Sequence, residues 1–492
     1  MFVGRKRELA RMEREYARDG FSFVTVRGRR RIGKTRLIKE FMKGKKGLYF
    51  SAREIPAEDN LELLAQDLFE CEGPTDASLE LVLSEVFRRA RDERFVLAID
   101  EYPRLCDRGS GTSSVLQEYI DRYGDGSKLF LILCGSSMTM MEKEVTGKES
   151  PLYGRRTETV ELKPFTYFES RLLLEGFSEE DRFRIYGMTG GMPAYLMRFD
   201  PSRTLEDTLV EEFIESGSYF RGESSAILMQ EIAGSGVHRR VLYAIASGHC
   251  RSSEISTKVG CSAPLTARYL NELVDLGLVA RTSPVDNRSE KIVRYAIRDE
   301  FLGFYYRRIY RLSEDMGEEE MRAAARRVLE LHDADLGRVF ERVSSQYLRY
   351  AWGGADGTWW GTDPVTRTVQ EIDLVLASER DGVETGLFVE CKYTREKVGA
   401  DVLEDLVYKS KLVKRFASRR YALCSRSGFA DGLEGRGDVL LLTLEDMVDG
   451  YPVRGGPPQI PIHSLPTILF SAAMAESDAR YDVLGLSGDG TL

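Results

Sequence analysis

Residues 21–41, FSFVTVRGRRRIGKTRLIKEF, constrain the fold of this chain more than any other stretch. An apolar, β-branched run predicts a strand that ends at Gly28, and apolar residues recur at helical spacing from Leu37 onward. Between them, the spacing G-x-x-x-x-G-K-T runs from Gly28 to Thr35. Glycines let the backbone N–H groups of such a loop converge on an anion, and the following helix adds its positive end. The stretch therefore predicts a strand, a phosphate-binding loop and a helix within a parallel α/β sheet.

A nucleoside triphosphate is the anion that this loop would hold. Lys34 would reach the β- and γ-phosphates, and the hydroxyl of Thr35 would bind Mg²⁺. The structural alternative is an ordinary glycine-rich turn between a strand and a helix. The residues expected to contact the nucleotide from this stretch are Gly28, Arg31, Gly33, Lys34, Thr35 and Arg36.

A second chemical element, FVLAIDE, occupies residues 95–101. Its apolar run predicts a buried parallel strand that delivers Asp100 and Glu101 at its carboxyl end, where α/β sheets place their ligands. Asp100 would order Mg²⁺ there, and Glu101 would activate the attacking water. A further buried strand leads to Ser136, which suits a position near the γ-phosphate. An N-cap for the next helix is an equally good structural role for that serine.

Six segments in this order, FVGRKREL, GRRRIGKT, FVLAIDE, LILCGSSMTMM, LYGRRTETVELKPF and GGMPAYL, resemble the archaeal ATPase family of P-loop proteins. The first segment also resembles the opening box of AAA+ and signal-transduction ATPases, which implies that Val3 and Gly4 pack against adenine. The resemblance further implies ATP and Mg²⁺ as cofactors, a winged helix, and a carboxyl-terminal domain similar to PD-(D/E)xK nucleases. Arg155 would act as an arginine finger on the γ-phosphate, supplied within the chain or by a second subunit of an oligomer. The alternative is that Arg155 is solvated or pairs with a carboxylate.

Residues 238–298 predict three helices followed by a β-hairpin, which is the pattern of a winged helix-turn-helix. The predicted recognition helix, residues 262–276, carries one arginine against two carboxylates, whereas the hairpin is basic. Because phosphate contacts supply most non-specific affinity, the hairpin is the favoured surface for DNA or RNA. A lid or a protein–protein module is the alternative. The basic hairpin residues are Arg281, Arg288, Lys291 and Arg294.

Two alternating strands near residues 369–377 and 385–393 flank Asp381-Gly382, a strong two-residue hairpin signal. A turn centred on this dipeptide places Asp373 opposite Glu390. The same register places Glu371 opposite Lys392. Two ionised carboxylates about 5 Å apart repel by roughly 3 kcal/mol at an effective dielectric of about 20. A buried face of this kind therefore requires a metal, an ammonium or a proton.

These residues match the D…E-x-K pattern of PD-(D/E)xK nucleases on Asp373, Glu390 and Lys392, with Glu341 as the additional helical carboxylate. The match implies a Mg²⁺ site in which Lys392 orients water for phosphodiester hydrolysis. Ile372 stands where the motif has proline, and some members of this superfold are inactive. The structural alternative is a solvated hairpin face with a cross-strand pair of lysine and glutamate.

Composition sets the remaining limits. A net charge of −9 excludes a global basic field, so any nucleic-acid contact is local. Seven single cysteines without C-x-x-C favour a reducing compartment, and the chain has no apolar run long enough for a membrane span, so we expect a cytoplasmic protein. The predicted domains are a P-loop ATPase core (1–165), a helical lid (166–232), a winged helix (233–312), a linker helix (313–330), a nuclease-like α/β domain (331–450) and an extension (451–492).

The function expected from the sequence is a Mg²⁺-using P-loop ATPase in which ATP hydrolysis repositions a winged helix and a nuclease-like domain on nucleic acid. One alternative is a metal-dependent nuclease for which ATP is a regulatory switch. The other is a nucleotide-gated interaction protein with an inactive carboxyl-terminal domain.

Overall fold

The computed structural model describes residues 2–70, 78–106, 111–232, 236–286, 292–380 and 383–451. The chain divides into two compact units. Unit 1 takes residues 1–165 together with the returning segment 192–198, and unit 2 takes residues 166–191 and those from 199 on. No helix within the described ranges combines the length and the apolar character that a bilayer crossing demands.

A five-stranded parallel sheet forms the centre of unit 1, in the order β2-β3-β4-β1-β5. The central strands β3 and β4 are buried along their whole length, which explains why they appear in the sequence as nearly continuous apolar runs. Since all strands run in one direction, their carboxyl ends share one edge of the sheet. The strands are β1 (Ser22–Arg27), β2 (Gly47–Ser51), β3 (Phe95–Asp100), β4 (Leu129–Gly135) and β5 (Glu158–Glu161).

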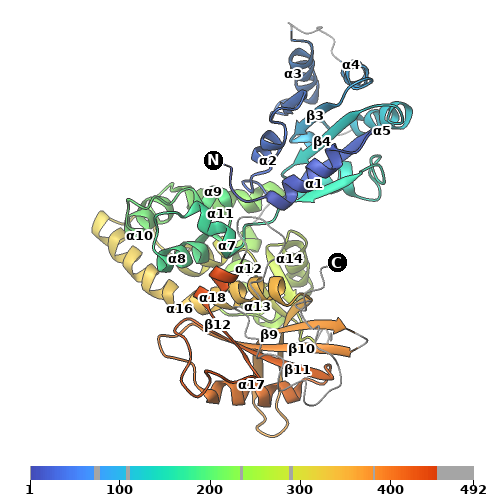
Figure 1. Cartoon of the computed structure of the whole chain (residues 1–492). Helices are drawn as coiled ribbons and strands as arrows, with labels where there is room; N and C mark the ends of the chain where they lie inside the picture. The colour runs from blue at the N-terminus through green and yellow to red at the C-terminus, as the bar shows by residue number, and fades with distance from the viewer. Residues whose placement is uncertain are drawn as a thin grey trace. The chain divides into compact units, whose positions relative to one another are not determined.

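Helices cover this sheet and bury an apolar cluster against it (Figure 1). Helix α2 starts directly after the glycine loop, so its amino-terminal end lies at the carboxyl edge of β1. The helices of unit 1 are α1 (Lys6–Tyr16), α2 (Lys34–Phe41), α3 (Ala57–Phe69), α4 (Leu79–Arg89), α5 (Thr112–Tyr123), α6 (Met138–Met141) and α9 (Pro193–Leu196).

Unit 2 begins with short helices and continues into three helices and a two-stranded sheet that have the element order of a winged helix-turn-helix. The short helices are α7 (Tyr167–Ser170), α8 (Glu179–Thr189), α10 (Leu205–Leu209) and α11 (Tyr219–Glu231). The winged-helix elements are α12 (Gly236–Ala246), α13 (Ser252–Val259), α14 (Ala263–Asp275), β6 (Val279–Thr282) and β7 (Arg294–Ile297), followed by α15 (Glu300–Phe304).

Helix α16 (Glu318–Ala351) is 34 residues long and runs through the boundary at residue 330 that the sequence predicts between a linker and the next domain. The reason is a single apolar stripe at helical spacing, which no proline interrupts. The stripe contains Ala325, Val328, His332, Leu336, Val339 and Val343, all of them buried. The predicted linker and the first helix of the carboxyl-terminal part are therefore one element.

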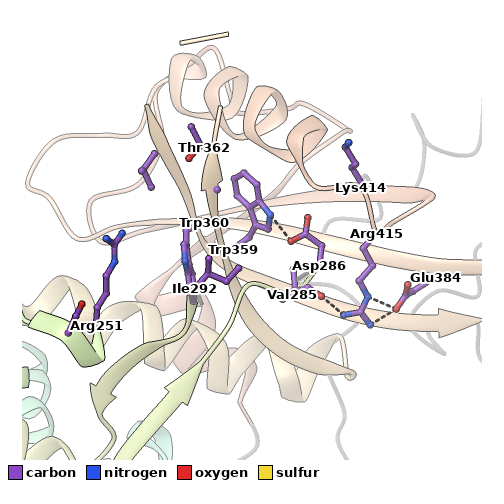
Figure 2. Close-up of a pocket in the computed structure, with 13 residues that line it drawn as sticks. Arg251, Val285, Asp286, Ile292, Trp359, Trp360, Thr362, Glu384, Lys414 and Arg415 are labelled. Carbon is purple, nitrogen blue, oxygen red and sulfur yellow. Dashed lines mark hydrogen bonds and ion pairs between the residues drawn. The ribbon is translucent and has the colours of Figure 1, made fainter. Parts of the chain in front are cut away.

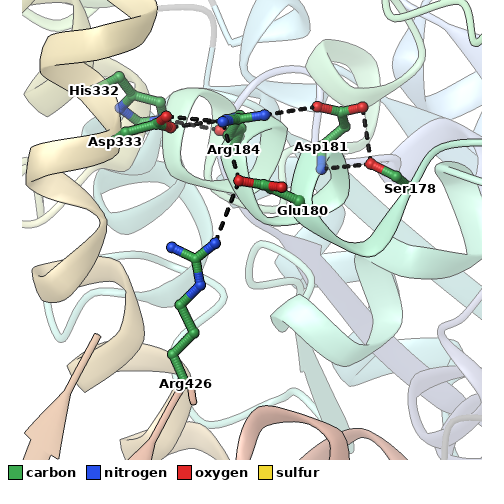
Figure 3. Close-up of polar contacts among 7 residues, drawn as sticks. All are labelled: Ser178, Glu180, Asp181, Arg184, His332, Asp333 and Arg426. Carbon is green, nitrogen blue, oxygen red and sulfur yellow. Dashed lines mark hydrogen bonds and ion pairs between the residues drawn. The ribbon is translucent and has the colours of Figure 1, made fainter. Parts of the chain in front are cut away.

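Arg184 on α8 joins three parts of unit 2 through ion pairs (Figure 3). Its guanidinium donates two hydrogen bonds, of 2.7 and 2.8 Å, to the carboxylate of Asp333 on α16. It also donates to Glu180 at 3.1 Å, and Glu180 accepts from Arg426 at 3.3 Å in turn. The ring of Phe183 on α8 stacks on that of Tyr393, which follows the strand with Lys392.

The carboxyl-terminal sheet has the order β12-β11-β10-β9-β8, with antiparallel pairs from β8 to β10 and parallel pairs from β10 to β12. Helix α16 packs one apolar cluster on this sheet, and helix α17 packs another. The elements are β8 (Ala355–Thr362), β9 (Val369–Arg380), β10 (Val383–Lys392), α17 (Ala400–Leu412), β11 (Ser418–Ser425), β12 (Leu440–Thr443) and α18 (Leu444–Gly450).

The hairpin register predicted from Asp381-Gly382 is confirmed along the ladder of β9 and β10. Arg380 pairs with Val383, and the pairing continues without a shift to Leu374 and Val389. The turn dipeptide itself lies outside the described residues. The next position along this register is the predicted pair of Asp373 and Glu390.

Candidate functional site

The glycine loop after β1 adopts backbone conformations that favour glycine. Gly28 has φ 150° and Gly33 has φ 98°, and a Cβ atom at Gly28 would lie 2.7 Å from the carbonyl oxygen of Leu162. Arg31 also has a positive φ, 69°, which costs a non-glycine residue conformational energy. The loop is therefore a strained conformation, of the kind that phosphate-binding loops adopt.

The ammonium of Lys34 lies inside this loop, and only 5% of the residue is exposed. Its Nζ donates to the carbonyl oxygens of Gly28, at 2.8 Å, and Arg29, at 3.1 Å. Burial lowers the pKa of Lys34, although the carboxylates of Glu101 and Asp100 oppose that shift. A buried ammonium whose partners are two neutral carbonyls is well placed to accept an anion.

Asp100, at the end of β3, lies beside Thr35 as the sequence predicts. The Thr35 hydroxyl donates to Oδ2 of Asp100 at 2.5 Å, and the backbone N–H of Glu101 donates to Oδ1 at 3.0 Å. A hydroxyl and a carboxylate at this distance form the oxygen donor set that Mg²⁺ prefers. Tyr49 is a contact that the sequence reasoning missed: its phenol donates to the same Oδ2 at 2.8 Å. Tyr49 lies on β2, where Ser51 pairs with Asp100 in the parallel register, and no local sequence pattern indicates that pairing.

Glu101 takes a left-handed backbone conformation, with φ 54° and ψ 42°. Its Oε2 accepts hydrogen bonds from the backbone N–H of Ser136, at 3.2 Å, and from the Ser136 hydroxyl, at 3.0 Å. The N-cap role belongs to Ser137 instead, because its Oγ accepts from the N–H of Met140 at 3.2 Å. Ser136 is therefore not the N-cap, and it contacts the carboxylate of Glu101 instead, while its position near the γ-phosphate stays a prediction.

A cavity of about 460 Å³ opens beside this group and is strongly basic. In the part of the chain that the structure describes, the wall of the cavity contains two carboxylates, those of Glu40 and Glu101, and a larger number of cations. Such an excess of positive charge stabilises a polyphosphate. Among the described residues, the cationic lining consists of Arg30, Arg31, Lys34, Arg36, Lys39 and Lys43, three of which (Arg30, Lys39 and Lys43) the sequence reasoning did not select.

The other residues predicted to contact the nucleotide, Val3, Gly4 and Arg155, do not line this cavity as described. Val3 is half-buried, and Gly4 has φ 67°, with the ring of Phe165 only 2.8 Å from where its Cβ would lie. Neither residue lines the cavity as described. Arg155 donates to both carboxylate oxygens of Asp121, at 2.6 and 2.7 Å. Of the two alternatives for Arg155, the structure shows the carboxylate pair within this chain, and the role of an arginine finger stays a prediction.

The carboxyl-terminal carboxylates also lie near one another. Oδ2 of Asp373 accepts the backbone N–H of Cys391 at 2.8 Å, and Lys392 Nζ donates to Oε1 of Glu390 at 2.7 Å. Glu390 is 6% exposed, and its Oε2 has no hydrogen-bond partner within the described part of the chain. Glu371 does not pair with Lys392 and accepts instead from Arg294 at 3.0 Å.

Burial and the charge of neighbouring carboxylates raise the pKa values of Asp373 and Glu341. Burial raises the pKa of Asp373 to about 6, with the charge of Glu390 adding to the shift. Burial likewise raises the pKa of Glu341 to about 8, and the charge of Asp373 adds to it. Within the described residues, however, no three His, Cys, Asp or Glu side chains are arranged to hold a metal ion. The predicted carboxylates lie near one another, but one oxygen of Asp373 and one oxygen of Glu390 already accept hydrogen bonds.

The predicted nucleic-acid surface of the hairpin is less available than the sequence indicates. Arg294 is paired with Glu371 and lies over the ring of Trp360, 4.3 Å from its centroid. Arg288 and Lys291 lie outside the described residues. On α14, Arg268 donates to Glu272 at 2.8 Å, so this helix keeps little free positive charge.

Two family models match separate segments of the chain. Residues 2–199 match a family described as the ATPase domain predominantly from Archaea. Residues 305–402 match a family of archaeal and bacterial proteins of unknown function. An uncharacterized protein of Methanocaldococcus jannaschii is 29% identical over 468 residues, which cover 91% of this chain and all of that protein.

The chain also matches solved structures, two of them over most of their own length. A Walker-type ATPase of Pyrococcus abyssi is 22% identical, with a TM-score of 0.48 over 62% of this chain and 96% of that one. The ORC1 protein of Aeropyrum pernix, solved in complex with DNA, is 15% identical, with a TM-score of 0.34 over 67% of this chain and 93% of that one.

Proposed function

Because residues 2–199 match the family described as the ATPase domain predominantly from Archaea, we propose that this chain hydrolyses ATP with Mg²⁺ and uses the hydrolysis to act on nucleic acid. One observation carries the proposal. Lys34, Thr35 and Glu101 line a basic cavity, and Asp100 accepts the hydroxyl of Thr35. The carboxylate of Glu101 accepts hydrogen bonds from the backbone N–H and the hydroxyl of Ser136. An ammonium, a hydroxyl and two carboxylates in this order are what phosphoryl transfer to water requires.

Each residue would contribute a separate step. The ammonium of Lys34 would leave the two loop carbonyls and bind the β- and γ-phosphates. Thr35 and Asp100 would hold Mg²⁺, which neutralises charge on the phosphate oxygens when it is bound. Glu101 would accept the proton of the attacking water, with Ser136 holding its carboxylate in position. The strained backbone of Glu101 supports this role, since strained residues concentrate at reactive sites.

The decisive experiment measures ATP turnover by the full chain with and without DNA or RNA. We expect turnover that rises when nucleic acid is added. Lys34→Ala should lose ATP binding, whereas Glu101→Gln should retain binding and lose at least about 100-fold in turnover, since the proton acceptor is removed. Absence of turnover in the wild type would contradict the proposal, and turnover that ignores every nucleic acid would contradict its second half.

A second candidate function is metal-dependent cleavage of nucleic acid by the carboxyl-terminal sheet. The unpartnered, buried Oε2 of Glu390 favours it, because such an oxygen is costly unless a cation or proton binds. Asp373 and Glu390 would hold the metal, and Lys392 would orient water. Asp373→Ala and Lys392→Ala, tested with Mg²⁺ on linear and branched DNA, separate this function from an inactive scaffold. Cleavage that survives both substitutions would rule the site out.

A further inference from the structure

A cleft of about 1210 Å³ lies in unit 2, between the winged helix and the carboxyl-terminal sheet (Figure 2). One wall comes from α13 and the wing, and the other comes from β8 and the residues after α17. Three contacts fix the walls to each other. The N–H of Val285 donates to the carbonyl oxygen of Thr358 at 3.2 Å, Arg415 donates to the carbonyl oxygen of Val285 at 2.9 Å, and Arg294 donates to Glu371 at 3.0 Å.

Among the described residues that line this cleft, cations outnumber carboxylates, and the cations come from both walls. Arg251, whose side chain is 62% exposed, belongs to the winged helix, and the exposed Lys414 belongs to the opposite wall. The two carboxylates of the lining are already engaged. Glu384 accepts from Arg415 at 2.5 Å, and Asp286 accepts the indole N–H of Trp359 at 3.0 Å. The charge left to face a ligand is therefore positive.

Apolar and aromatic surface lies between these cations. Trp360 is half-buried, and one face of its ring is covered by the guanidinium of Arg294. Val369 is 59% exposed at the start of β9, directly opposite Thr362. The cleft therefore contains an indole and an exposed valine between two separated cations. Such a groove can contact the apolar faces of rings and, next to them, anionic groups.

We propose that this cleft binds a single strand of DNA or RNA, an inference that rests on the proposed function and specifies its substrate class. A single strand offers unpaired base faces to Trp360 and Val369 and phosphates to Arg251 and Lys414. A duplex stacks its bases inside and would leave the apolar surface without a partner. The cleft exceeds the range of about 300–1,000 Å³ that is usual for small-molecule pockets, which favours a segment of a polymer.

Intrinsic fluorescence gives a direct readout, because the chain has three tryptophans and two of them line the cleft. The third, Trp352, is buried in the core. We expect unlabelled oligo(dT) to quench the emission of the full chain without ATP, and Trp360→Phe to remove most of that quenching. The same measurement in Lys34→Ala should be unchanged, so failure of the ATPase and failure of the cleft are separable.

Charge reversal locates the binding site. In fluorescence anisotropy with labelled oligo(dT), Arg251→Glu together with Lys414→Glu should weaken binding at least about tenfold and reduce the salt dependence of log K by about 1.4, for two lost phosphate contacts. The matched control is Arg327→Glu with Lys148→Glu, two exposed cations away from the cleft lining, which should stay within about twofold of wild type.

The proposal would be overturned by no binding of oligo(dT), by equal weakening in the control double variant, by binding without tryptophan quenching, or by tighter binding of a duplex of the same length. Polyglutamate of equal charge serves as a competitor. If it displaces oligo(dT) at the same concentration of charge, the occupant is an acidic peptide and the proposal is wrong.

Discussion

The phenol of Tyr49 and the hydroxyl of Thr35 donate to the same oxygen of Asp100, at 2.8 and 2.5 Å. Tyr49 thus holds the carboxylate through a hydrogen bond that would persist if the hydroxyl of Thr35 turned toward another ligand. Burial raises the pKa of Tyr49, with the charge of Asp100 adding to it, so the phenol remains a donor at neutral pH.

Removing this phenol tests its positioning role. Tyr49→Phe keeps the ring beneath the ammonium of Lys39, at 4.8 Å, and removes one hydrogen bond to a charged acceptor. Such a bond contributes about 1.5–3 kcal/mol. We expect kcat for ATP to fall about tenfold and the Mg²⁺ concentration for half-maximal turnover to rise. Tyr123→Phe, at an exposed position of the same unit, is the control. Equal kinetics in the two variants would exclude a positioning role.

A methyl group at Gly28 should distort the phosphate-binding loop. Its Cβ would lie 2.7 Å from a backbone oxygen, and φ 150° is unfavourable for alanine. We expect Gly28→Ala to lower the free energy of unfolding of the ATPase unit by about 1–3 kcal/mol and to abolish ATP binding, measured by urea titration and calorimetry. Gly20→Ala has a positive φ but no atom within 4 Å of the added Cβ, so it should keep ATP binding. Loss of binding in both variants would mean that strain alone, and not the clash, is responsible.

The stability of unit 2 should depend on pH through His332. Its Nε2 donates to the carbonyl oxygen of Arg184 at 3.0 Å, and burial lowers the pKa from 6.5 to about 4. Asp335 and Asp333 oppose this shift, and Arg308 adds to it. Above pH 6.5 the ring is neutral in both states. As the pH falls toward 4 only the unfolded chain binds the proton, so the free energy of unfolding falls by up to about 3 kcal/mol.

Urea titrations of the wild type and of His332→Gln between pH 8 and about pH 4 check this dependence. Glutamine keeps a hydrogen-bond donor and cannot titrate, so the difference between the two curves should narrow as the pH falls. His249→Gln, at a half-buried position, controls for the loss of a histidine. If the free energy of unfolding of the wild type and of His332→Gln changed in parallel with pH, His332 would not be the source of the pH dependence.

Arg184 should matter more to stability than an exposed arginine elsewhere in unit 2. Its paired hydrogen bonds to Asp333 connect α8 to α16, and its side chain is only 23% exposed (Figure 3). We expect Arg184→Met to cost about 2 kcal/mol, less than the 3–5 kcal/mol typical of a fully buried pair. Arg327→Met breaks an exposed pair with Glu330 and should cost less than about 1 kcal/mol. Similar urea midpoints for Arg184→Met and Arg327→Met would show that the pairing of Arg184 with Asp333 does not stabilise unit 2 more than the exposed pair does.

Sequence patterns predicted the elements that depend on local spacing. The strand before the glycine loop, the strand that ends at Asp100 and the hairpin of β9 and β10 follow from apolar runs and one turn dipeptide. The contact of Thr35 with Asp100 follows from the expectation that both residues bind the same Mg²⁺. Tyr49 was missed because its role depends on which strand neighbours β3, and no local pattern encodes strand order.

Long-range pairing explains the other differences. Arg155 and Arg294 are cations in exposed-looking stretches, yet each is engaged by a carboxylate far along the chain, Asp121 and Glu371. The length of α16 was missed for a different reason, since a charged, alanine-rich start and an apolar continuation look like two segments until their common stripe is traced.

That continuous helix has a geometric consequence. Each residue of an α-helix advances the side chain by about 100° around the axis, so Asp333 and Glu341 keep a fixed angular relation within α16. Inserting one alanine between them would rotate Glu341 away from Asp373 or Asp333 away from Arg184. The number of residues between Asp333 and Glu341 therefore determines the direction of one side chain relative to the other around the helix axis. This number matters to the carboxylate cluster as much as the identity of the residues.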